Sequence, residues 1–201
     1  MTGVQTCALP ISLTFYEHDT YVMQISGHIA DVPEFSRKTE ALFMPFITSW
    51  GWGTWDRAWR HFDPTAHGWE KIRDDRALRN RFNLDSHFDY ATMLQMQLDG
   101  KIDSWAIRWY LSVFMNGGLA LFPPRSFVRN IGFDSGTHGS RVLRWTLARQ
   151  AISDQPVSFP RVTQVVDDDY ALVQKALFRQ TGGQLGAMFR WARRCLGSGI
   201  R

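Results

Sequence analysis

Short apolar runs, each bounded by polar residues or glycine, punctuate the first part of the chain. The run YVMQISG at residues 21–27 is apolar, rich in residues that favour strands, and stopped by glycine, so it predicts a buried strand. ALFMPF at residues 41–46 and LALF at residues 119–122 have the same character. We therefore expect three short strands separated by much longer segments.

The stretch SWGWGTWDRAW combines tryptophan and glycine in a way that neither a helix nor a strand period explains completely. Thr54 is placed to cap a helix that follows it. On that helix Trp52, Trp55 and Trp59 would share one face. Trp50 would then lie outside the helix, in the glycine-containing loop.

Further helices are predicted between this stretch and the last strand. Residues 68–82 carry charges on most faces, which indicates one exposed helix. Residues 86–100 predict a helix that ends at its terminal glycine. Asp103 is placed to cap another helix over residues 104–116, which two glycines follow.

The sequence as a whole predicts a mixed α/β chain with one main domain. A chain of 201 residues with 44% hydrophobic content can bury one substantial core. Residues 123–140 have the composition of a long loop, and two helical segments follow a polar stretch after residue 140. We expect a domain over residues 12–140 and a helical, basic C-terminal extension over residues 141–201.

The charges of the chain give little reason to expect a nucleic-acid partner. The 23 lysines and arginines exceed the 19 acidic residues by only a net charge of +4, and the two signs are interspersed. No apolar stretch approaches the roughly 18 residues that a membrane span needs. The N-terminus also lacks the charged region of a signal peptide, so we expect a cytoplasmic location.

Residues 1–11 resemble the translation of a common sequencing-adapter oligonucleotide. We expect them to be foreign to the gene, the alternative being a genuine polar tail. Without this segment Cys195 is the one remaining cysteine, which excludes an internal disulfide and favours a reducing compartment. An adapter joined in frame also predicts that the natural protein continues upstream.

Several familiar catalytic motifs are missing from the sequence, including a glycine-rich phosphate loop, paired CxxC, HExxH and GxSxG. The run VTQVVDDDY at residues 162–170 contains Asp-x-Asp, a spacing that can share a divalent metal and a diphosphate. These acids, however, open a predicted helix whose dipole favours negative charge at that end. The helix explains Asp167, Asp168 and Asp169 without a metal.

Four stretches in this order carry a family resemblance: VMQISG, SWGWGTWDRAWRHFD, HFDYATMLQMQLDGKIDSWAIRWY and GLALFPPRSFVRNIGFDSGTHG. They resemble the acceptor half of a bacterial GT-A glycosyltransferase of the family-2-like kind, the nucleotide-diphospho-sugar transferases. The likeness spans about residues 13–139. More distantly, Asp103, Trp105 and Arg108, followed by a strand, a proline-rich turn and THG, are similar to elements of eukaryotic N-acetylglucosaminyltransferases.

The resemblance implies an incomplete GT-A fold, with the acceptor half present and C-terminal helices after it. In that family a preceding half holds a divalent metal, Mn²⁺ or Mg²⁺, and the diphosphate of the donor. The expected partners are a nucleotide-sugar donor and a saccharide or lipid-linked acceptor, in synthesis of surface polysaccharide or lipopolysaccharide. The implied reaction is inverting, and these 201 residues alone would be nearly inactive without the donor half.

Sugar transfer to a hydroxyl requires a base that takes the hydroxyl proton. Asp103 is the first candidate, because a carboxylate at a helix start within an apolar loop suits this role and the resemblance places the base near it. Asp89 is the second candidate. Each residue would serve equally as a plain helix cap, and the sequence leaves both roles open.

Indole rings are good platforms for the C–H faces of sugars, and glycine lets a loop approach a ligand closely. Trp50 and Trp52, on either side of Gly51, would line the acceptor pocket, while Trp55 and Trp59 would face the core. Burial of all four tryptophans in the core is the alternative.

Three further residues are weaker candidates for contact with the donor. His138 lies in a glycine- and serine-rich loop, where it would contact diphosphate or a metal as the resemblance allows. Arg129 and Arg125 would neutralise phosphate by the same logic, or lie in water.

Two interpretations remain beside the enzyme. The tryptophan stretch would also suit a non-catalytic carbohydrate-binding or interaction module. The basic C-terminal segment, residues 183–201, predicts an amphipathic helix with a solvated basic side, the alternative being peripheral contact with an anionic membrane at the inner face of the plasma membrane.

Overall fold

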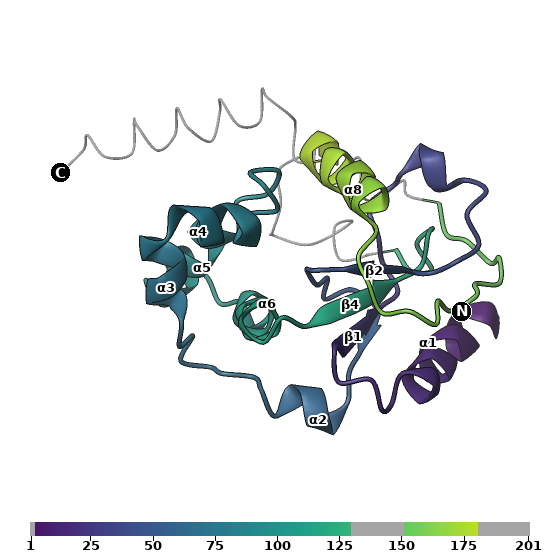
Figure 1. The fold of residues 1–201 in the computed structure, drawn as a ribbon, viewed down its shortest axis with the longest axis horizontal. Coiled ribbons are helices and arrows are strands. Elements are labelled where there is room, and N and C mark those ends of the chain that lie inside the picture. Colours follow the sequence, from purple (N-terminus) through teal and green to yellow (C-terminus); the bar gives the residue numbers. More distant parts are fainter. Residues whose placement is uncertain (1–2, 130–150, 181–201) are drawn as a thin grey trace.

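The computed structural model of the chain describes residues 3–129 and 151–180. In chain order its elements are α1 (Gly3–Phe15), β1 (Val22–Ser26), the short 3-10 helix η1 (Pro33–Phe35), β2 (Leu42–Met44), β3 (Trp52–Gly53), α2 (Asp56–Trp59), α3 (Trp69–Asp74), α4 (Arg76–Phe82), α5 (Tyr90–Leu98), α6 (Trp105–Met115), β4 (Leu119–Phe122) and α8 (Asp167–Gln180). Figure 1 shows a small central sheet, with α1 on one side of it and α6 and the group α3, α4 and α5 on the other.

Four strands form one mixed sheet in the order β2-β4-β1-β3. The central strands β1 and β4 are parallel, with Val22 opposite Leu119 and Ile25 opposite Leu121. The outer strands β2 and β3 each pair antiparallel with a central strand. A parallel pair needs a crossover connection, and here it contains β2, β3 and the helices α2 to α6.

Apolar side chains cover both faces of the sheet. Ile25, Phe43 and Leu121 belong to a smaller core cluster with Tyr16, against which Leu13 of α1 packs. The alternate strand residues point the other way, as the period of two residues in a strand requires. The protein therefore has three layers in this region: α1, the sheet, and the helical side.

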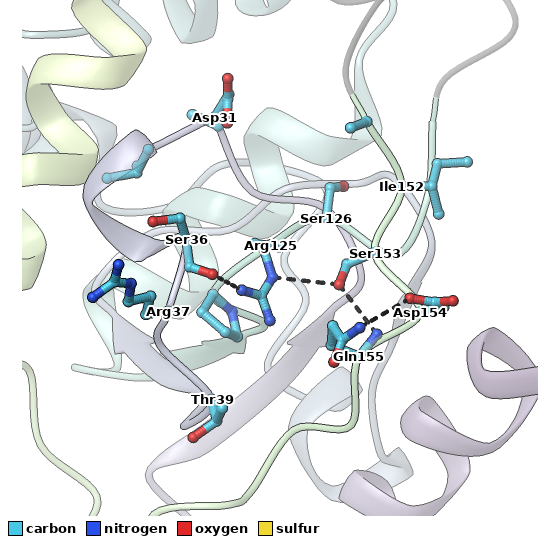
Figure 2. A pocket seen from close by; sticks show the side chains of 14 residues that line it. Asp31, Ser36, Arg37, Thr39, Arg125, Ser126, Ile152, Ser153, Asp154 and Gln155 are labelled. Atoms are coloured by element: carbon cyan, nitrogen blue, oxygen red, sulfur yellow. Dashed lines mark hydrogen bonds between the residues drawn. The ribbon is translucent and has the colours of Figure 1, made fainter.

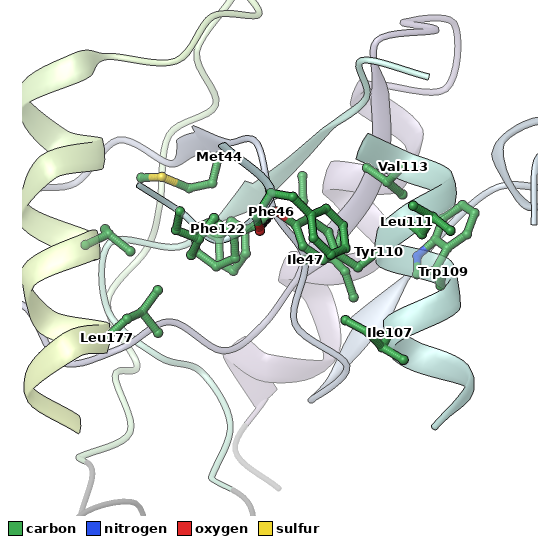
Figure 3. Packing of buried hydrophobic residues seen from close by; sticks show 14 of the residues in the cluster. Met44, Phe46, Ile47, Ile107, Trp109, Tyr110, Leu111, Val113, Phe122 and Leu177 are labelled. Atoms are coloured by element: carbon green, nitrogen blue, oxygen red, sulfur yellow. Dashed lines mark hydrogen bonds between the residues drawn. The ribbon is translucent and has the colours of Figure 1, made fainter. Parts of the chain in front are cut away.

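The larger core cluster lies on the helical side of the sheet. Figure 3 shows Met44 and Phe122 of the sheet packed beside Phe46, with Tyr110 of α6 and Leu177 of α8 on either side. The C-terminal part that the structure describes is thus built into the same core as the rest. It is also joined by an ion pair between Lys38 Nζ and Asp169 Oδ2 at 2.7 Å.

The three predicted strands are confirmed as β1, β2 and β4, and the helices predicted over residues 86–100 and 104–116 correspond to α5 and α6. Asp167, Asp168 and Asp169 open α8 as expected. These elements are local patterns with strong boundaries, which explains why the sequence alone predicts them.

The predicted tryptophan helix is confirmed only over Asp56–Trp59, and its start and its shared tryptophan face are wrong. Trp52 lies in β3, and α2 begins only at Asp56. Thr54 Oγ1 donates a hydrogen bond to a carbonyl of β1 at 2.6 Å instead of capping a helix. Trp55 Nε1 donates to the carbonyl of Leu13 at 3.0 Å, toward α1 and away from the other tryptophans. Pairing with β1 overrides the helical spacing of these residues.

The single exposed helix predicted over residues 68–82 is also wrong. The chain forms two helices there, because Asp75 ends α3 and caps α4. Its carboxylate accepts two backbone amides of α4 at 2.8 and 3.0 Å. Both helices contribute to the core through Trp69, Ile72 and Phe82.

Asp103 does not cap α6. The helix begins at Trp105, and its N-cap Ser104 makes no side-chain cap bond. The side chain of Asp103 is 98% exposed. The capping role that the sequence left open for this carboxylate is therefore excluded.

Helix α1 includes most of residues 1–11, and the foreign origin of that segment stays a prediction because a helix says nothing of the source of its codons. Within residues 3–129 and 151–180, no helix combines the length and the apolar character needed to cross a membrane. The basic segment at residues 183–201 lies outside the described residues.

Candidate functional site

The loop that contains Gly51 lies against the carboxyl end of β1. The backbone amide of Gly27 donates to the carbonyl of Gly51 at 2.7 Å. A Cβ on Gly27 would stand 2.7 Å from that oxygen, and Gly51 has a φ of +54°. Glycine at both positions therefore allows the loop to approach the strand end this closely.

Trp50 and Trp52 lie in two different surroundings. The ring of Trp50 meets His28 edge to face, with centroids 4.4 Å apart. The ring of Trp52 instead lies 5.1 Å from Trp105 and 5.9 Å from Trp59. The turn at Gly51 sends neighbouring indoles to separate places, so they do not form the single pocket that the sequence predicted.

Trp52 belongs to a group of aromatic rings that we call the tryptophan cluster, made of Trp52, Trp59, Phe62, Trp105 and Trp109. Trp59 stacks on Phe62 with centroids 4.6 Å apart and contacts Trp109 at 5.0 Å. Trp109 is buried, whereas Trp59 is 37% exposed and Trp105 is 40% exposed. The cluster thus presents two partly exposed indoles beside a buried one, and the prediction that Trp59 faces the core is wrong.

Trp50 lines a separate hollow of about 300 Å³, which we call the apolar cavity. Its walls come from the loop before Gly51 and from α5, α6 and α8, and include His28, Tyr90, Met93, Ile107 and Leu177. A hollow of this size and composition is at the lower end of the range of about 300–1,000 Å³ typical of small-molecule sites.

Helix α6 connects the tryptophan cluster and the apolar cavity. Trp105 and Trp109, one helical turn apart, contact the cluster. Ala106, Ile107 and Tyr110 line the cavity. Since residues three and four apart share a helix face, this one helix serves both places.

The two candidate bases stand at the starts of the helices that line the cavity. Asp103 comes two residues before α6, and Arg108 Nη2 lies 3.9 Å from its Oδ1. Arg108 is held in turn by a hydrogen bond from Nη1 to the carbonyl of Pro64 at 3.3 Å. Asp89 caps α5 by accepting the amide of Thr92 at 3.2 Å, so its structural role is confirmed.

The tyrosines of the apolar cavity are donors and not bases. Burial raises the pKa of Tyr90 and that of Tyr110 above their ordinary value. Both phenols therefore stay protonated at neutral pH. The hydroxyl of Tyr110 donates to the carbonyl of Phe82 at 3.0 Å.

The remaining candidates lie elsewhere. Arg129 is exposed, and His138 lies outside the described residues. Arg125 lines a second, polar cavity. Trp59, Phe62, Tyr90, Tyr110 and Leu177 are site residues that the sequence did not indicate, because their neighbours come from distant segments.

Within the part of the chain that the structure describes, no three His, Cys, Asp or Glu side chains gather as a metal would need. The resemblance places the divalent metal in a half that precedes these residues, and we derive no step through a metal.

The fold and site define a mixed α/β protein in which a tryptophan cluster and an apolar cavity share one helix. No family model, curated protein or solved structure matches this chain.

Proposed function

We propose that this chain is the acceptor-binding part of a glycosyltransferase that moves a sugar from a nucleotide diphosphate to an acceptor hydroxyl. One observation carries the proposal: α6 bears Trp105 on the tryptophan cluster and Ile107 on the apolar cavity, directly after the carboxylate of Asp103. The exposed indoles of Trp59 and Trp105 suit the C–H face of a sugar ring.

In the proposed reaction the acceptor oxygen forms a bond to the anomeric carbon while the bond from that carbon to the diphosphate breaks. The nucleoside diphosphate leaves with the electron pair. Asp103, which is accessible to solvent, takes the proton of the acceptor hydroxyl, and Asp89 is the second candidate for this role.

The apolar cavity favours one of the two acceptor types expected from the sequence. Burial of a free saccharide's hydroxyl groups in a cavity lined by Trp50, Met93, Ile107 and Leu177 would be unfavourable. An alkyl or prenyl chain attached to the acceptor sugar would bury apolar surface there. We therefore favour a lipid-linked acceptor.

Calorimetric titration of the chain with octyl β-glucoside, below its micelle concentration, and with methyl β-glucoside tests acceptor binding. We expect the octyl compound to bind at least about tenfold more tightly, because burial of each CH₂ contributes about 0.8 kcal/mol. Ala106→Phe, which fills the cavity, should remove this preference, and Ala77→Phe on the exposed side of α4 should not. Equal affinity for the two glucosides would contradict the assignment of the cavity.

Trp105→Ala should weaken binding of both glucosides. Tyr21→Ala is the matched control, because Tyr21 is an aromatic residue that is 68% exposed and belongs to neither site. Equal loss in the two variants would show that the tryptophan cluster does not hold the sugar.

Transfer itself is measured in the complete gene product with a UDP-sugar and Mn²⁺. Asp103→Asn should lower kcat by about 10²-fold or more while the affinity for octyl β-glucoside stays the same. Asp89→Asn, which retains an oxygen for the cap, tests the second candidate. If neither variant loses transfer, these carboxylates are not the base.

A non-catalytic carbohydrate-binding module is the second candidate function. The full exposure of Asp103 favours it, because catalytic carboxylates are commonly shielded from water. Such a module would bind glucosides through the tryptophan cluster, show no transfer, and be indifferent to Asp103→Asn.

A further inference from the structure

A second cavity, of about 660 Å³, lies on the other side of the segment that follows β1. Residues 30–32, after β1, and residues 124–126, after β4, form part of its wall. Because β1 and β4 are parallel, these segments meet at the carboxyl edge of the sheet. Ligands of open α/β sheets bind preferentially at this edge.

Arg125 projects into this polar cavity from a rigid position. Two buried prolines, Pro123 and Pro124, separate it from the end of β4. Its Nη1 donates to the carbonyl of Ser36, and its Nε donates to Ser153 Oγ at 3.4 Å. Figure 2 shows the guanidinium held between these two residues, which come from opposite walls.

No described carboxylate neutralises the charge of Arg125. Among residues 3–129 and 151–180, no carboxylate lies within ion-pair distance of its guanidinium, and Nη2 makes no hydrogen bond. Both groups that hold it are neutral oxygens. A half-buried cation with free donors and neutral supports is arranged to accept a negative ligand.

The rest of the wall is consistent with a polar, anionic ligand. Residues with hydroxyl groups line the cavity, among them Thr39, Ser126 and Ser153. Two carboxylates, Asp31 and Asp154, also line the cavity and oppose an anion. Both are exposed, and Figure 2 shows Asp31 turned away from the guanidinium. Solvent screens such exposed charges more than it screens Arg125.

We propose that the polar cavity is a binding site for an oxyanion, a phosphate or carboxylate group on a small polar molecule, with Arg125 Nη2 as the principal donor. The inference does not depend on the proposed transferase function. His28 lines the apolar cavity and Ala30 lines the polar one, so the two sites are divided by one short segment of chain.

Calorimetric titration of the chain with inorganic phosphate, uridine 5′-monophosphate, glucose 1-phosphate and acetate tests the site, and in the wild type the Nε–H resonance of Arg125 is followed as well. We expect that resonance to shift when the ligand binds. The affinity measured by calorimetry should fall at least tenfold in Arg125→Gln but not in Arg76→Gln, which removes an exposed arginine on α4. The tightest of the four ligands identifies the source of the oxyanion.

Thr39→Asp provides a second variant, since it adds negative charge at the exposed rim and leaves both supports of Arg125 in place. It should weaken phosphate binding by a similar factor even if Arg125→Gln fails to fold. Failure of all four ligands to bind, or equal binding by wild type, Thr39→Asp and Arg76→Gln, would overturn the proposal.

Discussion

The indole Nε1 of Trp109 donates a hydrogen bond to Oε1 of Gln24 at 2.8 Å, inside the core between α6 and β1. The amide nitrogen of Gln24 donates in turn to Ser26 Oγ at 2.8 Å and to the carbonyl of Thr48 at 2.7 Å. The register of β1 against β4 shifts between Val22 and Gln24. One buried amide therefore fixes the helix, the strand and the loop that carries Trp50.

Gln24→Met should lower the free energy of unfolding by about 1–3 kcal/mol, because it leaves the Trp109 indole and the Thr48 carbonyl without their buried partner. Urea unfolding measures the change. Gln164→Met, at an exposed position, should change stability by less than about 0.5 kcal/mol. Similar losses in both variants would mean that the network contributes little.

Gly27→Ala should displace the loop that contains Trp50 and Gly51, because the new methyl group would stand 2.7 Å from the Gly51 carbonyl oxygen. We expect the free energy of unfolding to fall by about 1–3 kcal/mol and the Trp50 indole N–H resonance to shift. Gly100→Ala is the control: its φ of +69° disfavours alanine, but nothing lies within 4 Å. That variant should lose stability without moving the Trp50 signal.

Asp75→Ala and Asp103→Ala form a matched pair at the starts of α4 and α6. Removing the Asp75 carboxylate should cost about 0.5–2 kcal/mol, because two backbone amides lose their acceptor. Removing that of Asp103 should change thermal stability by less than about 0.5 kcal/mol, since it caps nothing. A large loss of stability in Asp103→Ala would restore the structural role that the structure excludes.

Stability should fall at alkaline pH. Burial raises the pKa of Tyr170 to about 12, and the pKa values of Tyr90 and Tyr110 are also raised by burial. Between pH 10 and the higher pKa of the folded state, only the unfolded chain loses these protons, so unfolding becomes easier as the pH rises. Each such tyrosine contributes a slope of about 1.4 kcal/mol per pH unit.

Urea unfolding at several values between pH 8 and 11.5 measures this slope. Tyr110→Phe should reduce it, and Tyr170→Phe should reduce it further. A free energy of unfolding that is constant above pH 10 would contradict the burial of these phenols.

The 201-residue chain, incubated alone with UDP-glucose, Mn²⁺ and octyl β-glucoside, should give no turnover, because we assign acceptor binding and not donor binding to it. Release of UDP is the readout. Efficient release of UDP would show that our assignment of acceptor binding alone to this chain is wrong.

The sequence predicted the elements whose signals are local. The apolar runs of β1, β2 and β4 and the glycine that ends α5 need no knowledge of distant residues. It failed at Trp52, where an i, i+3, i+7 spacing with Trp55 and Trp59 indicated one helix but pairing with β1 made a strand, so that the helix begins only at Asp56.

The site was less predictable than the fold, because its walls come from segments far apart in the sequence. The sequence singled out Asp103, Trp105 and Trp50 as candidates. Nothing in it indicates that Leu177 of α8 lines the same cavity as Trp50. The spacing of Trp105 and Trp109 against Ile107 and Tyr110 is the exception: it indicates two different faces on α6.

The parallel pairing of β1 with β4 also has a consequence for synthesis on the ribosome. Leu119 pairs with Val22, so β1 emerges long before its central neighbour exists. Closing so long a loop carries an entropic cost before any contact repays it, which makes such sheets slow to fold. During that delay the apolar side chains of β1 are open to aggregation or to a chaperone, and β3 is the strand that can shield one edge first.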